Sequence, residues 1–157
     1  MTLPFYVDLD ADMAQSFGNL IWATVVLEGL VNRVCMTLLG SDWHEGRRVG
    51  KSIESARAIA ESRHDSAGLQ ATRWLDEAKS HTYLRNQVLH ATVAAHMDPA
   101  DLSKVASYSL RNVRWDQHTE RDVETLTPLT VENLETIRSR VESAIQGFTA
   151  VDIALVA

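Results

Sequence analysis

Cysteine is nearly absent from this chain, and its histidines do not form metal-binding patterns. The single cysteine, Cys35, excludes a disulfide within one chain. It stands near Val31, Val34 and Leu38, and a free cysteine among apolar residues usually packs in a core. None of the six histidines lies four residues from another on a predicted helix, and none is paired with the cysteine, which disfavours zinc. We therefore expect neither a metal nor another cofactor.

Positive charge is also scarce. The chain has 15 lysine and arginine residues against 21 aspartate and glutamate residues, a formal net charge of −6 at pH 7. A protein with this balance does not coat nucleic acid by bulk electrostatic attraction, so contact with RNA would depend on a local basic cluster. The candidate RNA-binding residues are Arg47, Arg48 and Lys51, together with Arg111 and Arg114 further along the chain.

The sequence lacks an uninterrupted apolar run of the kind that crosses a membrane. Its longest apolar stretch, residues 20–39, contains Glu28, Asn32 and Arg33, which favours a buried helix of a soluble protein. The chain does not open with a cationic segment, an apolar core and a small-residue cleavage site, so a secretory signal is not indicated. These features predict a cytoplasmic protein without a membrane partner.

Length and composition suit one domain spanning residues 1–157. At 157 residues and 45% hydrophobic, the chain can bury one core of ordinary size but hardly two. Apolar residues recur at helical spacing in four segments. We predict helices from a cap at Asp10 or Asp12 to about Leu39, over roughly 51–63, from a cap at Ser66 through residue 90, and from a cap at Thr130 onward.

One segment departs from the helical pattern. Within an insertion at residues 92–127, polar and apolar residues partly alternate up to about residue 117, which predicts a small hairpin. Trp22 and Trp74 lie on helical segments and are expected in the core. The predicted fold class is therefore all-α: an up-and-down bundle of four main helices with a small irregular or β-hairpin insertion before the last helix.

The basic segment between Gly46 and Gly50 is similar to a phosphate-binding loop but departs from it in two ways. That loop needs four residues between its glycines and follows a strand, whereas here three residues intervene and a helix precedes them. Nucleotide hydrolysis is therefore not indicated. A narrower hypothesis remains, that the free amides of the helix start and Lys51 hold an RNA phosphate.

The most informative motif is Arg85-Asn86-Gln87-Val88-Leu89-His90 at the end of the third predicted helix. Arginine keeps its charge and can bind a phosphate, while histidine can transfer a proton near neutral pH. Five steps of about 100° turn His90 roughly 140° from Arg85, so the two do not share a helix face. The motif forms one site only if the helix ends near His90 or a second chain supplies its own copy.

This motif resembles that of the HEPN superfamily, small helical proteins carrying an arginine, usually a following polar residue, and a histidine after four to six intervening residues. The matching residues are Arg85, Asn86 and His90. The order of elements is also similar: a long apolar helix with an internal glutamate at Glu28, a second helix, the helix with the motif, an insertion and a closing helix. The resemblance thus covers most of the chain, although only the motif is specific.

The resemblance implies a metal-independent endoribonuclease, a toxin or defence nuclease whose two motifs face each other across a homodimer. His90 would take a proton from a ribose 2′-hydroxyl or give one to the leaving 5′-oxygen, and Arg85 would stabilise charge on the phosphoryl oxygens. Asn86 would orient or contact the phosphate. Such proteins are often neutralised by a companion protein, such as a small nucleotidyltransferase.

Two alternatives remain open from the sequence. The superfamily includes non-catalytic members, so the chain can instead be a helical module for dimerisation or for binding a partner or nucleic acid. The motif residues also have purely structural uses. Arg85 can pair with Glu28 or Asp76 to orient helices, and His90 can interact with the last carbonyls of its own helix.

Overall fold

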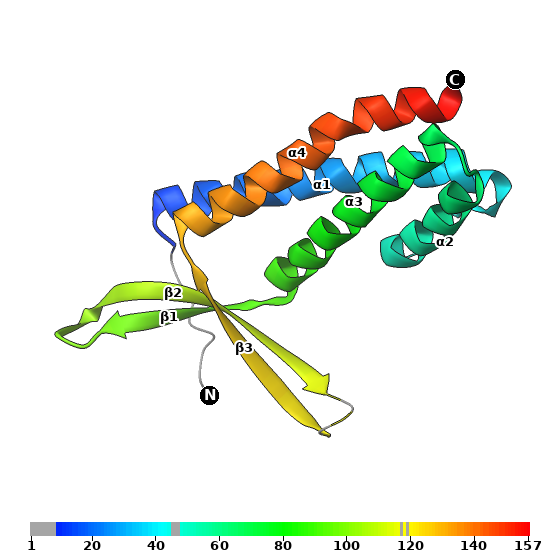
Figure 1. Ribbon diagram of the computed structural model, residues 1–157. Coiled ribbons are helices and arrows are strands. Elements are labelled where there is room, and N and C mark those ends of the chain that lie inside the picture. The colour runs from blue at the N-terminus through cyan, green and yellow to red at the C-terminus, as the bar shows by residue number, and fades with distance from the viewer. Residues whose placement is uncertain (1–8, 45–47, 117, 119) are drawn as a thin grey trace.

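The computed structural model describes residues 9–44, 48–116, 118 and 120–157, without the side chains of 83–90, 92, 103 and 114–116 (Figure 1). The described chain contains four α-helices, one 3₁₀ turn and one antiparallel sheet of three strands. The elements, in chain order, are α1 (Ala11–Leu39), η1 (Gly40–Asp42), α2 (Val49–Ser62), α3 (Ser66–His90), β1 (Thr92–Asp98), β2 (Asp101–Asp116), β3 (Arg121–Leu129) and α4 (Val131–Val156).

The ends of α1 and the start of α4 follow the predicted capping signals. The Asp10 carboxylate accepts a hydrogen bond from the backbone N of Met13 at 2.8 Å, and the Thr130 hydroxyl accepts one from the backbone N of Asn133 at 3.1 Å. Helix α1 stops at Gly40, whose φ of 54° is readily reached only by glycine. These predicted boundaries are confirmed.

Helices α2 and α3 form an antiparallel hairpin with a tight turn. The cap of α3 is Asp65 rather than the predicted Ser66, because Asp65 has the extended backbone and its carboxylate accepts the backbone N of Gly68 at 2.6 Å. Two ion pairs join the helices, Arg57 Nε to Asp76 Oδ1 at 2.7 Å and Lys79 Nζ to Glu54 Oε1 at 3.1 Å. Asp76, which the sequence offered beside Glu28 as an alternative partner of Arg85, is thus paired with Arg57.

The direction of the helices differs from an up-and-down bundle, in which the first and fourth helices run antiparallel. Here α1 and α4 lie side by side and run the same way, while α3 runs against them (Figure 1). Arg33 Nη2 of α1 lies 2.7 Å from Asp152 Oδ2 near the end of α4. At the other end, Met13 and Val131 line one hollow. The sheet between α3 and α4 brings the chain back to the start of α1.

The core lies between α1, α3 and α4, with α2 covering one side. Trp74 of α3 is buried there, donates its indole N–H to the carbonyl of Ala144 at 2.8 Å, and has its ring centroid 5.9 Å from that of Phe148. Cys35 is buried, as predicted. The prediction for Trp22 was wrong, since 70% of its surface is exposed.

The prediction of an all-α fold was wrong, because the segment before α4 is a three-stranded antiparallel sheet and the protein is a mixed α and β structure. Strand β2 is long enough to have two partners. β1 pairs with its residues 101–111 and β3 with its residues 108–116, so three strands overlap only at 108–111. Beyond this overlap, two two-stranded ribbons point away from each other (Figure 1).

Helix α1 together with η1 (Ala11–Asp42) is the one helical segment, among the described residues, long and apolar enough to cross a membrane by length and composition alone. The core helix of a soluble protein or a signal sequence meets the same criterion. Helix α1 packs against α2, α3 and α4, and its buried face supplies a large part of the core.

Candidate active site at the end of helix α3

The predicted motif occupies the last turns of α3. The helix continues to His90, and Ala91 then adopts an extended backbone with φ −78° and ψ 149°, from which β1 begins. The prediction that the helix ends near His90 is therefore confirmed, and the motif lies at a helix C-terminus that joins a strand. The side chains of Arg85, Asn86 and His90 themselves lie outside the described part of the structure.

The sheet brings one of the predicted basic residues to this helix end. Thr92, two residues after His90, is the strand partner of Arg111. Arg111 therefore lies in β2 directly beside the segment that leaves α3. Arg114 lies three residues further along β2, opposite Val123, and its side chain is outside the described part.

Arg111 is already engaged by a carboxylate. Its Nη2 atom lies 3.0 Å from Oε2 of Glu124 on β3. The hydrogen bond and the charge of Glu124 raise the pKa of Arg111, and the hydrogen bond from Arg111 lowers the pKa of Glu124. Both side chains are about half exposed, so the pair is well solvated. An RNA phosphate near Arg111 would compete with Glu124 for the guanidinium.

The start of α2 approaches α3 from another side. Arg57 of α2 pairs with Asp76 of α3, and Glu54 of α2 pairs with Lys79 of α3. Because the helices are antiparallel, each step of three residues toward the start of α2 lies level with a step of three residues toward the end of α3. The same progression sets residue 51 level with residue 82, and residue 48 level with residue 85. Arg48, the N-cap of α2, and Lys51 in its first turn thus lie level with the start of the motif along α3, and both are exposed.

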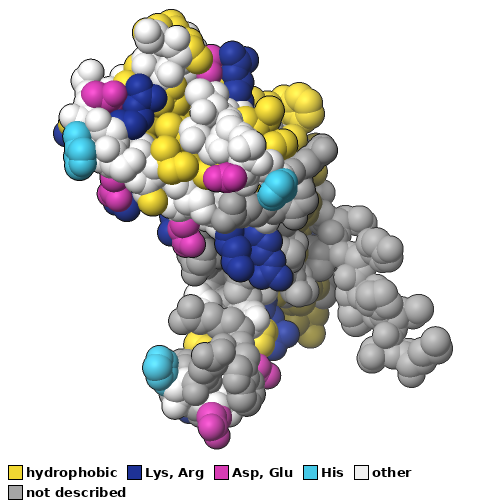
Figure 2. Space-filling view, turned by 90° about the vertical axis from the view of Figure 1, so that its right-hand side faces the viewer, with side chains coloured by type: hydrophobic (Ala, Val, Ile, Leu, Met, Phe, Trp, Pro, Cys, Tyr) yellow, Lys and Arg dark blue, Asp and Glu magenta, His cyan; other side chains and the backbone are white. Residues whose placement is uncertain are grey.

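Two predicted basic sets, far apart in the sequence, therefore flank the end of α3. They do not merge into one patch, because α2 contacts α1 and α3 but no strand within the described residues. Figure 2 views the molecule from the right-hand side of Figure 1, and lysine and arginine side chains cluster near the middle of this view. Arg47, the remaining member of the first set, lies outside the described residues.

A buried histidine that the sequence analysis did not single out lies four residues before Arg85. His81 is 6% exposed, its Nδ1 atom has no hydrogen-bond partner among the described residues, and its Nε2 atom is 4.0 Å from Oε1 of Glu77. Burial lowers the pKa of His81, the charge of Glu77 opposes this, and the charge of Arg140 on α4 adds to it. The signal was present in the sequence, because residue 81 continues the apolar stripe of Ala71, Trp74 and Ala78.

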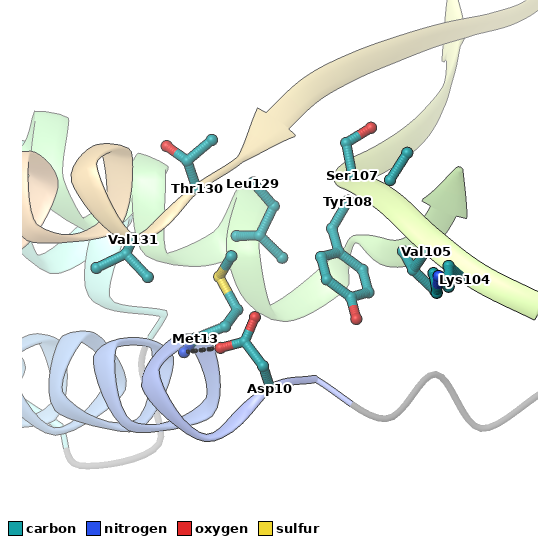
Figure 3. A pocket seen from close by; sticks show the side chains of 10 residues that line it. Asp10, Met13, Lys104, Val105, Ser107, Tyr108, Leu129, Thr130 and Val131 are labelled. Carbon is teal, nitrogen blue, oxygen red and sulfur yellow. Dashed lines mark hydrogen bonds between the residues drawn. The ribbon is translucent and has the colours of Figure 1, made fainter. Parts of the chain in front are cut away.

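A separate hollow of 620 Å³ lies where the first half of β2 meets the starts of α1 and α4 (Figure 3). Its apolar lining includes Met13, Leu129 and Val131, and Figure 3 shows the Tyr108 ring facing them. The two charged side chains in its lining already have partners: the Asp10 carboxylate caps α1, and Lys104 Nζ lies 3.0 Å from Asp101 Oδ2. The hollow shows no arrangement of groups suited to a specific reaction.

Within the described part of the chain, no group of three or more histidine, cysteine, aspartate or glutamate side chains is placed to hold a metal ion. The expectation of no metal and no cofactor remains a prediction.

Comparisons with known proteins add no assignment. The chain matches no protein-family profile, no curated protein sequence and no solved structure. The resemblance to the HEPN superfamily therefore rests on the motif residues and on the order of the helices.

Proposed function

We propose that the protein is a metal-independent endoribonuclease of HEPN type and that the end of α3 is its active site. The observation that supports this best is the arrangement around that end. Arg48 and Lys51 of α2 and Arg111 of β2 flank the motif from separate elements, although they were selected as RNA-binding candidates from sequence alone. A ribonuclease needs cations placed along the RNA backbone on both sides of the cleaved phosphate.

In the proposed reaction, His90 acts as the general base or acid. The ribose 2′-oxygen attacks the adjacent phosphorus, its proton passes to the base, and the 5′-oxygen leaves with a proton from the acid. The products are a 2′,3′-cyclic phosphate and a 5′-hydroxyl. Arg85 stabilises the charge that grows on the phosphoryl oxygens, and Asn86 orients one of them.

The remaining parts of the proposal follow from the resemblance. The substrate is RNA, and two copies of the motif act together in a homodimer. The protein works in the cytoplasm as a toxin or defence nuclease, with a companion protein that neutralises it. The acidic balance of the chain supports a restricted RNA substrate rather than every single strand.

The test is cleavage of a labelled mixed RNA pool in the presence of a chelator. We expect the purified wild type to cut RNA and leave cyclic phosphate ends. His90→Ala should lose at least about 100-fold in rate, because general acid–base catalysis typically contributes ~10²–10⁴. His44→Ala removes an exposed histidine in the loop after α1 and should cleave like the wild type. A folded, dimeric wild type that does not cleave any RNA in the pool would reject the proposal.

A second candidate is a non-catalytic helical module, and the ion pairs of the surface favour it. Most of the described lysine and arginine side chains are bound to carboxylates, which leaves little free positive charge for RNA. These are Arg33, Arg57, Arg63, Lys79, Lys104, Arg111 and Arg138. Expression in a host separates the two functions. A nuclease slows growth and His90→Ala relieves the effect, whereas a binding module leaves growth unchanged in both forms.

A further inference from the structure

The outward side of α1 does not have the composition of a solvent-facing helix surface. Eight positions fall within about 80° of each other on the side opposite the buried face, at 100° per residue, and none of them is charged. They are Ala11, Ala14, Gly18, Trp22, Val25, Gly29, Asn32 and Met36, here called the α1 outer face. Trp22 is 70%, Val25 47% and Met36 48% exposed.

Helix α4 shows what an ordinary outer face looks like in the same protein. From its start to residue 146, its exposed side carries Glu132, Ser139, Glu142 and Gln146. A tryptophan exposed on a long apolar stripe is typical of interaction surfaces rather than of free solvent-facing helices. The α1 outer face therefore has the composition of an interaction surface.

We infer that the α1 outer face binds the same face of a second copy of this chain, in an antiparallel helix pair around a twofold axis. The positions from Gly18 to Met36 recur in steps of four and three, the seam spacing of paired helices. A twofold axis between Val25 and Val26 sets Trp22 of each copy opposite Gly29 of the other. A side chain added at Gly29 meets nothing within 4 Å in its own chain, so this space can receive the indole.

Charge supports a second copy as the occupant. Two copies of an acidic protein, with a formal net charge of −6 each, repel least when the surface through which they meet carries no charge of its own. The α1 outer face is such a surface. The nearest charge, Arg33, is held by Asp152 at 2.7 Å and lies at the edge of the face. A lipid surface fits less well, because helices that lie on membranes carry many lysines and arginines beside the apolar face, and the start of α1 is acidic.

The available area sets the expected strength. Residues 11–36 span about 39 Å of helix, and half the circumference of a helix about 10–12 Å wide gives roughly 600–700 Å². This is slightly below the ~800 Å² per partner of a standard interface. Ile153 and Val156 of α4, which are 62% and 70% exposed and lie within one turn of Asp152, extend the apolar area. The contact is therefore expected to be a weak, reversible one.

This contact is independent of the proposed nuclease site. Helix α3 packs on the inner side of α1, so pairing through the outer face leaves both α3 ends free for a separate contact. Loss of one contact need not affect the other, and the two inferences can fail separately.

The experiment measures the oligomeric state of the full chain by sedimentation equilibrium from about 1 to 100 µM. We expect reversible association through α1 whose dissociation constant rises at least tenfold in both Trp22→Gln and Gly29→Gln. Where the α3 ends also pair, this association joins dimers rather than monomers. The second variant should also melt about 2–4 °C higher, because glycine is unfavourable inside a helix and the new side chain meets nothing in the monomer. A loss of dimer in Gly29→Gln would therefore not be explained by a destabilised monomer.

Gly50→Gln is the matched control, since Gly50 is also helical with nothing within 4 Å, but lies on α2. It should dimerise like the wild type. A wild type that stays monomeric at 100 µM overturns the inference. So does an association that both α1 substitutions leave unchanged, which would assign every contact between copies to another surface such as the α3 end. Sedimentation with phosphatidylglycerol–phosphatidylcholine vesicles that Trp22→Gln abolishes would overturn it in favour of a lipid surface.

Discussion

His81 shows how one buried side chain couples folding to pH. Its imidazole is enclosed between α3 and α4, and its Nδ1 atom has no hydrogen-bond partner among the described residues. Burial disfavours the charged form, so the pKa of His81 is lowered from the ordinary value near 6.5. Arg140 acts in the same direction and Glu77 against it. The folded protein therefore holds His81 neutral at pH 7.

We expect the free energy of unfolding to fall as the pH drops below about 6.5. In that range His81 binds a proton in the unfolded chain but stays neutral in the folded chain, so acid favours unfolding. The decrease ends once the pH lies below the lowered pKa of His81 in the folded state. For one proton the slope is at most about 1.4 kcal/mol per pH unit. His81→Leu should flatten this dependence in urea melts between pH 7.5 and 5.5, whereas the exposed-site variant His44→Gln should keep it. An unchanged slope in His81→Leu would contradict the assignment.

At the scale of elements, the α2–α3 hairpin depends on a close approach at its turn. An added Cβ at Gly68, in the first turn of α3, would collide with the carbonyl oxygen of Ala60 and would lie 2.9 Å from Cβ of Arg63. Both obstacles are close to rigid, the first being backbone. The approach sets the angle between α2 and α3, and hence the position of Arg48 and Lys51 relative to the motif.

Gly68→Ala should destabilise the protein by about 1–3 kcal/mol, the usual cost of forcing extra volume into a packed contact. The sign of the change in the free energy of unfolding is informative, because replacing glycine by alanine inside a helix normally stabilises a protein by roughly 0.5–1 kcal/mol. Gly147→Ala in α4 is the control, since its Cβ would meet only the Trp74 ring, at ordinary distances of 3.5 Å from Cδ1 and 3.7 Å from Nε1. Urea unfolding of both variants checks the prediction, and a stabilised Gly68→Ala would show that the turn can open freely.

At the scale of the whole molecule, the helical core and the distal ribbons are nearly independent. Only Ser109, Leu110 and Leu129 are buried among the described side chains of the sheet, and all three lie at or beside the overlap of the three strands. Among the described residues, the close backbone approaches between the sheet and the helices are those of α3 to β2 and of α4 to β3. The outer part of the β2–β3 ribbon, beyond the pair of Asn112 and Thr125, includes the exposed Val113 and lies outside the overlap of the three strands.

The outer part of that ribbon should therefore be removable. Asn112 and Thr125 are strand partners, so replacing residues 113–124 by Asn-Gly makes a two-residue hairpin turn of the favoured type. We expect the helical circular dichroism signal and the melting temperature to stay within about 4 °C of the wild type, the shift of roughly 1 kcal/mol. Collapse of the helical signal would show that the ribbon stabilises the bundle.

Features fixed by near neighbours in the chain could be predicted from the sequence. The caps at Asp10 and Thr130, the stop at Gly40 and the end of α3 at His90 were all found, because each depends on side chains and backbone within about four residues. The burial of Cys35 and Trp74 also followed from helical periodicity. The motif could be located on its helix for the same reason.

The errors concern contacts between distant segments. Trp22 was expected in the core because it lies on an apolar helix, although its position at 100° per residue is on the side opposite the buried residues. The long β2 strand was read as part of a small hairpin, because its second partner, β3, follows a polar turn and has mostly exposed side chains. Alternation is a weak signal where neither face of a ribbon is buried.

The sequence by itself determined the four helices, most of their ends and the motif at the end of α3, because local hydrogen bonding and side-chain spacing decide these. Only the tertiary structure decided that α1 and α4 run parallel, that three strands separate α3 from α4, and that Arg48, Lys51 and Arg111 flank the motif. It also exposed the uncharged outer face of α1. These features arise from packing between segments tens of residues apart, which depends on how whole elements bury their apolar sides together.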